Sequence, residues 1–225
     1  MYKFEQYQFK SSLFDQNTIH GFGTKAYGDA KKNLRSFIQP YQTHGTTIEH
    51  INSTGLAKEY SQSPPNADGL ITNIPNITLS VMTADCVPII YSDSTKGIIG
   101  ITHGGWKGTL SNISEIMISK FISLGSKVGD IKVAIGPAIG TCCYEVSDNI
   151  ASRYKSNFGS SVVDSFKINL MRANYISLLR TGLLPSNIDR GFFCTSCQSN
   201  KFWSYRRDGG IIGEMISYVK LKFMS

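Results

Sequence analysis

Short apolar runs in the middle of the chain predict a β-sheet. The runs at 77–82, 87–93 and 97–103 are rich in β-branched residues, have the length of buried strands and are separated by turn-forming residues. Pro88 lies at the start of its run, where a missing N–H is tolerated. Further strands are predicted at 131–136, 201–207 and 215–223.

A change of period marks the helices. From Thr109 to Gly125, apolar residues recur with the i, i+3, i+4 spacing of an amphipathic helix, which predicts a helix over 109–124. A second helix is expected to begin at Ser147. A third is marked by apolar residues spaced from Ile168 to Leu183 and is expected to end at Gly182. Strands and helices mix without a regular βαβ rhythm. The pattern therefore predicts one α+β domain over residues 1–225, with a mixed sheet covered by helices.

Composition narrows the functional class. The 225 residues carry a net charge of +7, but the basic residues are scattered, so an anionic small ligand is favoured over nucleic acid. No apolar run approaches the roughly 20 residues of a membrane span, and the first residues lack the pattern of a signal peptide. The odd count of five cysteines argues against a disulfide framework. We therefore expect a cytoplasmic protein without a membrane partner.

Two stretches place reactive side chains among apolar residues. "MTADCVPII" contains Asp85 and Cys86, and "ITHGGWKGT" contains His103. If strands 77–82 and 98–103 share a sheet, Cys86 and His103 emerge near one edge, and His44 could join them from an earlier loop. Two imidazoles and a thiolate suit zinc and leave a fourth position open, as in catalytic sites. Spacing alone leaves open a buried free cysteine with two ordinary surface histidines.

Four further cysteines and a pair of adjacent arginines are also candidate functional residues. Cys194 and Cys197 form a C-x-x-C, and the adjacent Cys142 and Cys143 make a poor second pair, so we expect this motif to be structural or incidental and dispensable for activity. "SYRRDGG" supplies Arg206 and Arg207, which could bind phosphate together with the helix start after Gly108. A solvated edge strand is the alternative for the arginine pair.

Several blocks in order along the chain carry a family resemblance. "YQTHG", "NADGLITN", "VMTADCVPIIYSD", "THGGWKGT", "GPAIGTCCYEV" and "FWSYRRDGG" resemble the signature blocks of the laccase-domain family, which is also called the multicopper polyphenol oxidase or purine nucleoside phosphorylase family. The resemblance implies a single-domain α+β fold similar to a toxin deamidase domain, and a zinc ion held by His44, Cys86 and His103. It also implies phosphorolysis of adenosine, guanosine, inosine and methylthioadenosine, and deamination of adenosine.

The resemblance also suggests which other residues act in catalysis and in substrate binding. Cys86, His103 and Asp85 are the candidate catalytic residues, with Asp85 or Glu145 transferring a proton or orienting a ligand histidine. The candidate substrate-binding residues are Arg206 and Arg207 for phosphate, Trp106 and Tyr144 for stacking a purine, and Glu145. Packing in the apolar core is the alternative role for either aromatic ring. The expected partners are purine nucleosides and phosphate, and the expected state is a monomer or small homo-oligomer.

The chain departs from the family pattern at four places. The N-terminal block is shortened to "GTKAYGDA" at 23–30, Asn169 replaces an aspartate, and Lys107 and Glu214 stand where arginines are usual. These departures leave the three metal-type residues intact and bear on substrate preference.

Three other functions compete with a zinc enzyme. Without metal, Cys86 and His103 could act as the nucleophile and base of a hydrolase or amidase. A copper polyphenol oxidase is disfavoured because multicopper sites need roughly ten imidazoles, and the chain has 4 histidines. A non-enzymatic domain with a structural zinc would need a fourth ligand, for which the sequence offers no good candidate.

Overall fold

The computed structural model describes residues 2–5, 8–28, 37–210 and 213–222. The strands are β1 (Tyr2–Glu5), β2 (Gln8–Ser11), β3 (Thr18–Gly23), β4 (Phe37–Ile38), β5 (Ile48–Ile51), β6 (Gly69–Thr72), β7 (Thr78–Thr83), β8 (Val87–Asp93), β9 (Ile98–Gly104), β10 (Lys132–Ile135), β11 (Val163–Asp164), β12 (Lys167–Ile168), β13 (Ile188–Asp189) and β14 (Met215–Leu221). The α-helices are α1 (Lys25–Gly28), α2 (Thr54–Gln62), α3 (Trp106–Leu110), α4 (Ile113–Ser123), α5 (Asp148–Phe158), α6 (Leu170–Arg180) and α7 (Tyr205–Asp208), and short 3-10 turns cover Val128–Asp130, Ser160–Val162 and Pro185–Asn187.

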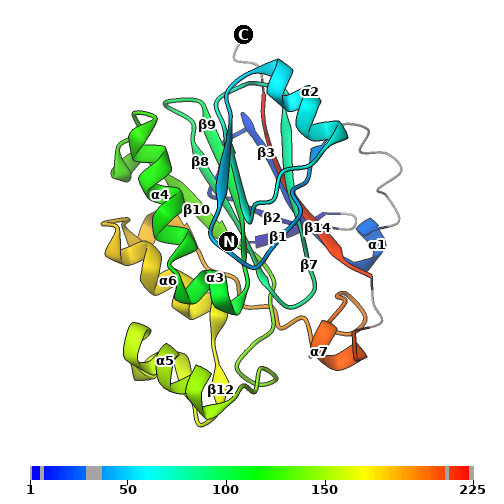
Figure 1. Cartoon of the computed structure of the whole chain (residues 1–225), viewed down its shortest axis with the longest axis vertical. Coiled ribbons are helices and arrows are strands. Elements are labelled where there is room, and N and C mark those ends of the chain that lie inside the picture. Colours follow the sequence, from blue (N-terminus) through cyan, green and yellow to red (C-terminus); the bar gives the residue numbers. More distant parts are fainter. Residues whose placement is uncertain (1, 6–7, 29–36, 211–212, 223–225) are drawn as a thin grey trace.

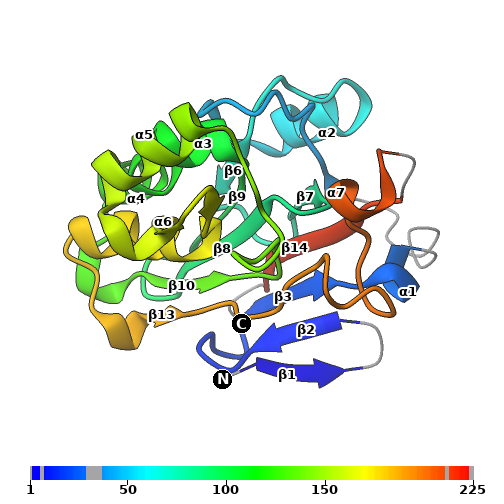
Figure 2. The same ribbon diagram turned by 90° about the horizontal axis from the view of Figure 1, so that it is seen from below.

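The elements form three layers. One sheet has the order β1-β2-β3-β14-β7-β4 and the other β13-β10-β8-β9-β6-β5, while β11 and β12 form a separate hairpin-like pair. Figure 1 shows α3 to α6 side by side along the second sheet, and Figure 2 shows that sheet lying between these helices and the first sheet. Both large sheets contain parallel and antiparallel pairs. The predicted mixed α+β architecture is confirmed, with two large sheets in place of one.

The middle layer explains why the central runs are continuously apolar. All seven residues of β8 and of β9 are buried, because each strand has a covered face on both sides. Side chains alternate between the two cores. Ile89 and Tyr91 pack in the core beneath the helices, whereas Ile90 and Ile101 pack in the core between the sheets.

Most predicted elements agree with the structure, and two differ. The runs at 77–82, 87–93, 97–103, 131–136 and 215–223 are confirmed as strands β7, β8, β9, β10 and β14. The predicted helix over 109–124 is two helices, because Asn112 adopts a left-handed conformation with φ of 60° between α3 and α4. The strand predicted at 201–207 is wrong, since Ser204 caps helix α7 by accepting a hydrogen bond from the Arg207 N–H.

The sequence predicts no segment that spans a membrane. Among the residues that the structure describes, no helix is long and apolar enough to cross a membrane.

Close packing between β3 and the end of β10 yields a stability prediction. A methyl group on Gly136 would lie 2.3 Å from Cδ1 of Phe22, a buried ring that cannot swing away. We expect Gly136→Ala to lower the free energy of unfolding by about 1–3 kcal/mol, measured by urea denaturation. Gly129→Ala is the control, because nothing lies within 4 Å of its added methyl. Equal midpoints for the two variants would contradict the packing described.

Candidate metal centre

The three predicted ligands meet at one edge of the second sheet. His44 lies in the loop before β5, Cys86 directly precedes β8, and His103 is the next-to-last residue of β9. Their ligand atoms all lie within 4.8 Å of one another. The antiparallel β8–β9 register pairs Val87 with Gly104 and so places Cys86 beside the end of β9. The predicted convergence is confirmed, although its expected cause is wrong: β7 belongs to the other sheet, and β8 is the strand that pairs with β9.

Asp68 organises this edge and was not among the residues predicted for the site. Its fully buried carboxylate lies 2.8 Å from Nδ1 of His103, and it accepts backbone hydrogen bonds from Thr43, His44 and Gly45 at 3.1, 2.9 and 2.7 Å. With Nδ1 donating to Asp68, His103 keeps Nε2 as the nitrogen with a free lone pair. The orienting role expected of Asp85 or Glu145 therefore falls to Asp68. The available signal was its place in "NADGLITN", directly before a buried strand.

The charges at the site favour a thiolate. Burial alone would raise the pKa of Cys86, but the charge and hydrogen bond of His103, with help from His44, lower the pKa of that thiol to about 7. Burial alone would lower the pKa of His103, yet Cys86 and Asp68 raise it to about 9. Burial opposes the shift at Asp68 as well, and the hydrogen bonds from His103, Gly45 and Thr43 hold the pKa of its carboxyl at about 2.

The donor set fits a divalent metal ion. Two imidazoles and a thiolate are ligands that zinc accepts readily, and the rings of His44 and His103 stand nearly perpendicular with centroids 4.8 Å apart. Space is kept open by Gly105, where an added Cβ would lie 3.0 Å from His44 and 3.5 Å from the Cys86 sulfur. His44 is itself exposed, so the group is open to solvent on one side.

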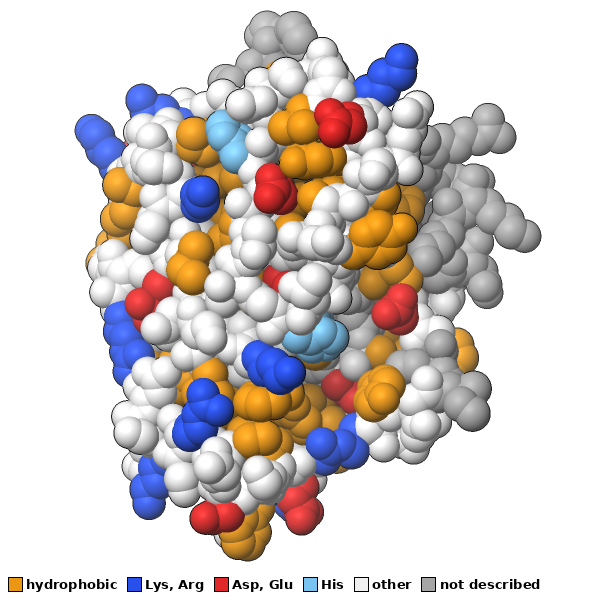
Figure 3. Space-filling model, viewed as in Figure 1, with side chains coloured by type: hydrophobic (Ala, Val, Ile, Leu, Met, Phe, Trp, Pro, Cys, Tyr) orange, Lys and Arg blue, Asp and Glu red, His pale blue; other side chains and the backbone are white. Residues whose placement is uncertain are grey.

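A cavity of about 520 Å³ lies next to this group. It is lined by Trp106, Tyr144, Glu145, Val146, Ser147, Ile150 and Arg206. Trp106 follows Gly105 in the chain, and burial together with the nearby Cys86 charge raises the pKa of Tyr144 to about 12. Four of the predicted substrate-binding residues are therefore brought together beside the metal-type ligands. Figure 3 shows basic side chains and exposed apolar surface side by side on the lower part of this face of the molecule.

Asp85 occupies a different position from the one predicted. Its buried carboxylate accepts hydrogen bonds from the Thr195 hydroxyl at 2.6 Å, the Ser204 hydroxyl at 3.0 Å and the Arg206 N–H at 2.8 Å. These bonds tie the 195–206 segment to the residue next to Cys86. The geometry supports an anchoring role for Asp85, in place of the predicted proton transfer.

The two adjacent arginines have different surroundings. The Arg207 guanidinium donates to the carbonyls of Thr195, Ser196 and Phe202 and forms a two-point contact with Asp208. It therefore holds α7 in place, and this arrangement favours a structural role over the predicted binding of phosphate. Arg206 instead lines the cavity, where its guanidinium lies 5.1 Å from the Tyr144 ring centre and donates to the Glu145 carbonyl at 2.6 Å.

The helix start that was predicted after Gly108 does not exist. Helix α3 already begins at Trp106, and Gly108 and Thr109 are buried within it. An added Cβ at Gly108 would lie 2.7 Å from the Gly45 carbonyl oxygen, so the glycine allows α3 to approach the His44 loop closely.

The departures from the family pattern leave His44, Cys86 and His103 unchanged. Asn169 caps α6 by accepting from the Arg172 N–H, a bond that an aspartate would make equally well. Lys107 lies over the Trp106 ring at 5.6 Å, and Glu214 is exposed. Residues 29 and 30 of the shortened N-terminal block lie outside the described residues.

The chain is similar to several known proteins. Residues 24–222 match the sequence profile of the family described as multi-copper polyphenol oxidoreductase laccase. A purine nucleoside phosphorylase of Bacillus subtilis is 30% identical over 84% of this chain and 72% of its own length. A mouse purine nucleoside phosphorylase is 35% identical over 94% of this chain, which spans only 57% of that protein.

The chain is also similar to a deaminase and to a solved structure. An adenosine deaminase from an unknown prokaryotic organism is 31% identical over 79% of this chain and 72% of its own length. The crystal structure of a hypothetical protein from Bacillus licheniformis superposes with a TM-score of 0.88, at 27% identity, over 98% of this chain and 99% of that one.

The role of Asp68 can be tested by a small change. Asp68→Asn keeps the size of the side chain but removes the negative charge that orients His103, so we expect metal affinity to fall by about 10- to 100-fold. The measurement is a competition titration with a chromogenic chelator. Asp130→Asn, at an exposed carboxylate, is the control. Unchanged affinity in Asp68→Asn would show that His103 does not depend on this contact.

Proposed function

Because this chain belongs to the multi-copper polyphenol oxidoreductase laccase family, we propose that it is a zinc-dependent purine nucleoside phosphorylase that also deaminates adenosine. One observation carries the proposal: the open group of His44, Cys86 and His103 adjoins a cavity lined by two aromatic rings and an arginine. The names of the related phosphorylases and deaminase point to the same substrates.

The three-residue group would hold the metal. His44, Cys86 and His103 would be its protein ligands, with Asp68 fixing the orientation of His103. Bound there, zinc would supply Lewis-acid catalysis at neutral pH. Three protein ligands leave room for a small molecule, which distinguishes a catalytic site from a closed structural one.

The cavity suits a purine nucleoside. Trp106 and Tyr144 present aromatic surface on which a purine ring can stack. The Tyr144 ring is already covered on one side by the Arg206 guanidinium, which limits the movement of both side chains. The exposed carboxylate of Glu145 lies at the same cavity and can accept a hydrogen bond from a ribose hydroxyl.

Phosphorolysis requires an anion to be held beside the sugar. A phosphate oxygen forms a bond to C1′ of the ribose while the bond from C1′ to the base nitrogen breaks, and the base leaves with a proton. Arg206 is the arginine that lines the cavity, and its fork of N–H donors matches phosphate. We therefore assign phosphate binding to Arg206 and a structural role to Arg207.

A metal-free thiol hydrolase is the second candidate. The lowered pKa of Cys86 and the raised pKa of His103 describe a thiolate–imidazolium pair, as found in cysteine nucleophiles. Activity that survives chelators and is lost on alkylation of Cys86 would favour this candidate. Copper polyphenol oxidation is disfavoured because the described residues bring only two of the four histidines to the site.

The proposal predicts different requirements for the two reactions. With inosine, the chain should release hypoxanthine and ribose 1-phosphate only when phosphate is present, whereas deamination of adenosine should proceed without phosphate. Arg206→Ala should slow phosphorolysis by about 10- to 100-fold, the value of a lost charge-assisted contact, and should affect deamination much less. Both reactions are followed by liquid chromatography of the bases and nucleosides.

Two variants complete this test. Cys86→Ala should abolish both reactions because both use the same site. Arg153→Ala, at an exposed arginine of α5, should leave both rates unchanged. Release of base at the same rate in phosphate-free buffer would instead identify a nucleoside hydrolase and contradict the proposal.

A further inference from the structure

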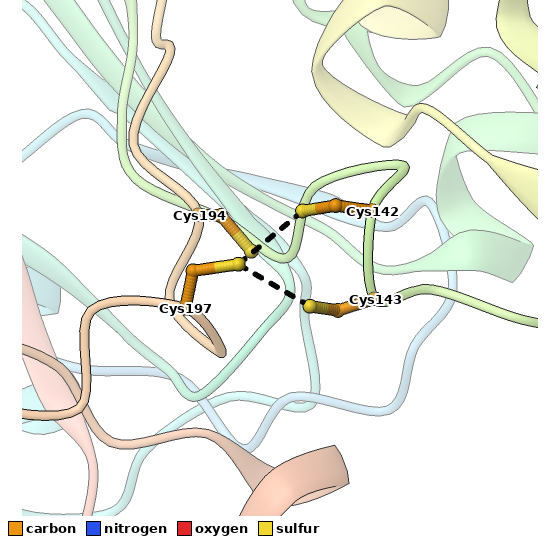
Figure 4. A group of neighbouring side chains, drawn as sticks. All are labelled: Cys142, Cys143, Cys194 and Cys197. Carbon is orange, nitrogen blue, oxygen red and sulfur yellow. Dashed lines mark hydrogen bonds between the residues drawn. The ribbon is translucent and has the colours of Figure 1, made fainter.

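Four of the five cysteines meet at a second place in the molecule. Cys142 and Cys143 lie in the turn after β10, and Cys194 and Cys197 lie in the turn before α7. Their sulfurs are all within 4.8 Å of one another, and the Cys197 sulfur is 3.4 Å from those of both Cys142 and Cys143. Figure 4 shows the four side chains pointing toward a common centre. The expectation that the C-x-x-C lacks a partner pair is therefore wrong.

The spacing of the sulfurs suits a metal ion better than a disulfide. Zinc–sulfur bonds of about 2.3 Å in a tetrahedron place neighbouring sulfurs about 3.8 Å apart. A disulfide would need about 2.05 Å between two sulfurs, and Cys142, Cys143, Cys194 and Cys197 are all free thiols. Four thiolates around one point form the closed, all-sulfur set of structural zinc sites, and soft ligands of this kind select zinc over harder cations.

The backbone is shaped around the four sulfurs. The two segments run in parallel, with the Ala138 N–H donating to the Phe193 carbonyl at 3.2 Å and the Thr195 N–H donating to the Ala138 carbonyl at 3.0 Å. The Gly140 N–H donates to the Cys194 sulfur at 3.2 Å. A side chain at Gly140 would lie 3.3 Å from the Cys142 sulfur, so glycine leaves the cluster its space. Backbone N–H groups aimed at sulfur stabilise the charge of a thiolate ligand.

We propose that Cys142, Cys143, Cys194 and Cys197 bind a structural Zn²⁺ ion that is distinct from the centre at Cys86. The site extends beyond the proposed enzymatic function and does not depend on it. Each thiol loses its proton on binding, and the four sulfurs leave the ion no open position for substrate.

The position of this site indicates what the ion would stabilise. Tyr144 and Glu145 of the substrate cavity directly follow Cys143 in the chain. On the other segment, Thr195 lies between the two cysteines and donates to Asp85, next to Cys86. The ion would therefore join the segment that supplies Tyr144 and Glu145 to the segment that leads to Arg206 of the same cavity.

Metal content per chain tests the site independently of catalysis. We expect about two zinc equivalents in the intact chain and about one in the double variant Cys142→Ser/Cys197→Ser, measured by mass spectrometry of the metal after dialysis. Cys86→Ala should also retain about one, while the control Ser199→Ala, at an exposed residue beside Cys197, should retain both. Equal zinc in the double variant and the intact chain would overturn the four-cysteine site, whereas equal zinc in Cys86→Ala and the intact chain would count only against the proposed catalytic centre.

A second measurement keeps the test decisive if the double variant fails to fold. Cobalt loaded into Cys86→Ala, which retains all four cluster thiols, should give the intense visible absorption and thiolate-to-metal charge transfer of a tetrahedral four-sulfur site. Absence of these bands in folded, reduced protein would overturn the proposal. Disulfide bonds among the four cysteines in protein purified under reducing conditions, detected as resistance to alkylation after unfolding in the presence of a chelator, would overturn it as well.

Discussion

The geometry of the candidate centre depends on the hydrogen bonds that the buried Asp68 carboxylate accepts. One buried side chain binds Nδ1 of His103 and the backbone N–H groups of Thr43, His44 and Gly45, so it joins the end of β9 to a loop far from it in sequence. A buried carboxylate is costly unless its oxygens are satisfied, and here they accept four such bonds and a fifth from the Thr43 hydroxyl. The need to satisfy this charge fixes where His44 and His103 lie.

Asp85 performs a corresponding task on the other side of Cys86. It binds Thr195, Ser204 and the backbone of Arg206, and so brings the last part of the chain to the start of β8. Asp85 and His44 both have a positive φ, 91° and 59°. Such a conformation costs of order 1–3 kcal/mol per residue in a non-glycine residue. In both cases the hydrogen bonds of a buried aspartate hold the chain in that conformation, and the result is that the Cys86 sulfur lies close to the rings of two histidines.

The strands and the meeting of His44, Cys86 and His103 could be predicted from the sequence because they depend on local pattern and on blocks of neighbouring residues. The buried runs that became β8 and β9 are apolar on both faces, a signal that is strong in sequence. Pairing between strands is not local, so β7 was mistaken for the neighbour of β9. Contacts that depend on the folded chain also could not be predicted from the sequence. The hydrogen bonds from Arg207 to three carbonyls form only in the fold that residues 195–208 adopt. The two cysteine pairs meet only because Ala138 lies beside Cys194.

X-ray absorption at the zinc edge tests the central claim, that His44, Cys86 and His103 bind one metal ion, most directly. The measurement uses the zinc-loaded Cys142→Ser/Cys197→Ser chain, in which only this centre should be occupied. We expect a first shell with one sulfur at about 2.3 Å and nitrogen or oxygen neighbours at about 2.0–2.1 Å, with the outer scattering of two imidazoles. A shell of oxygen and nitrogen alone, without sulfur, would contradict it.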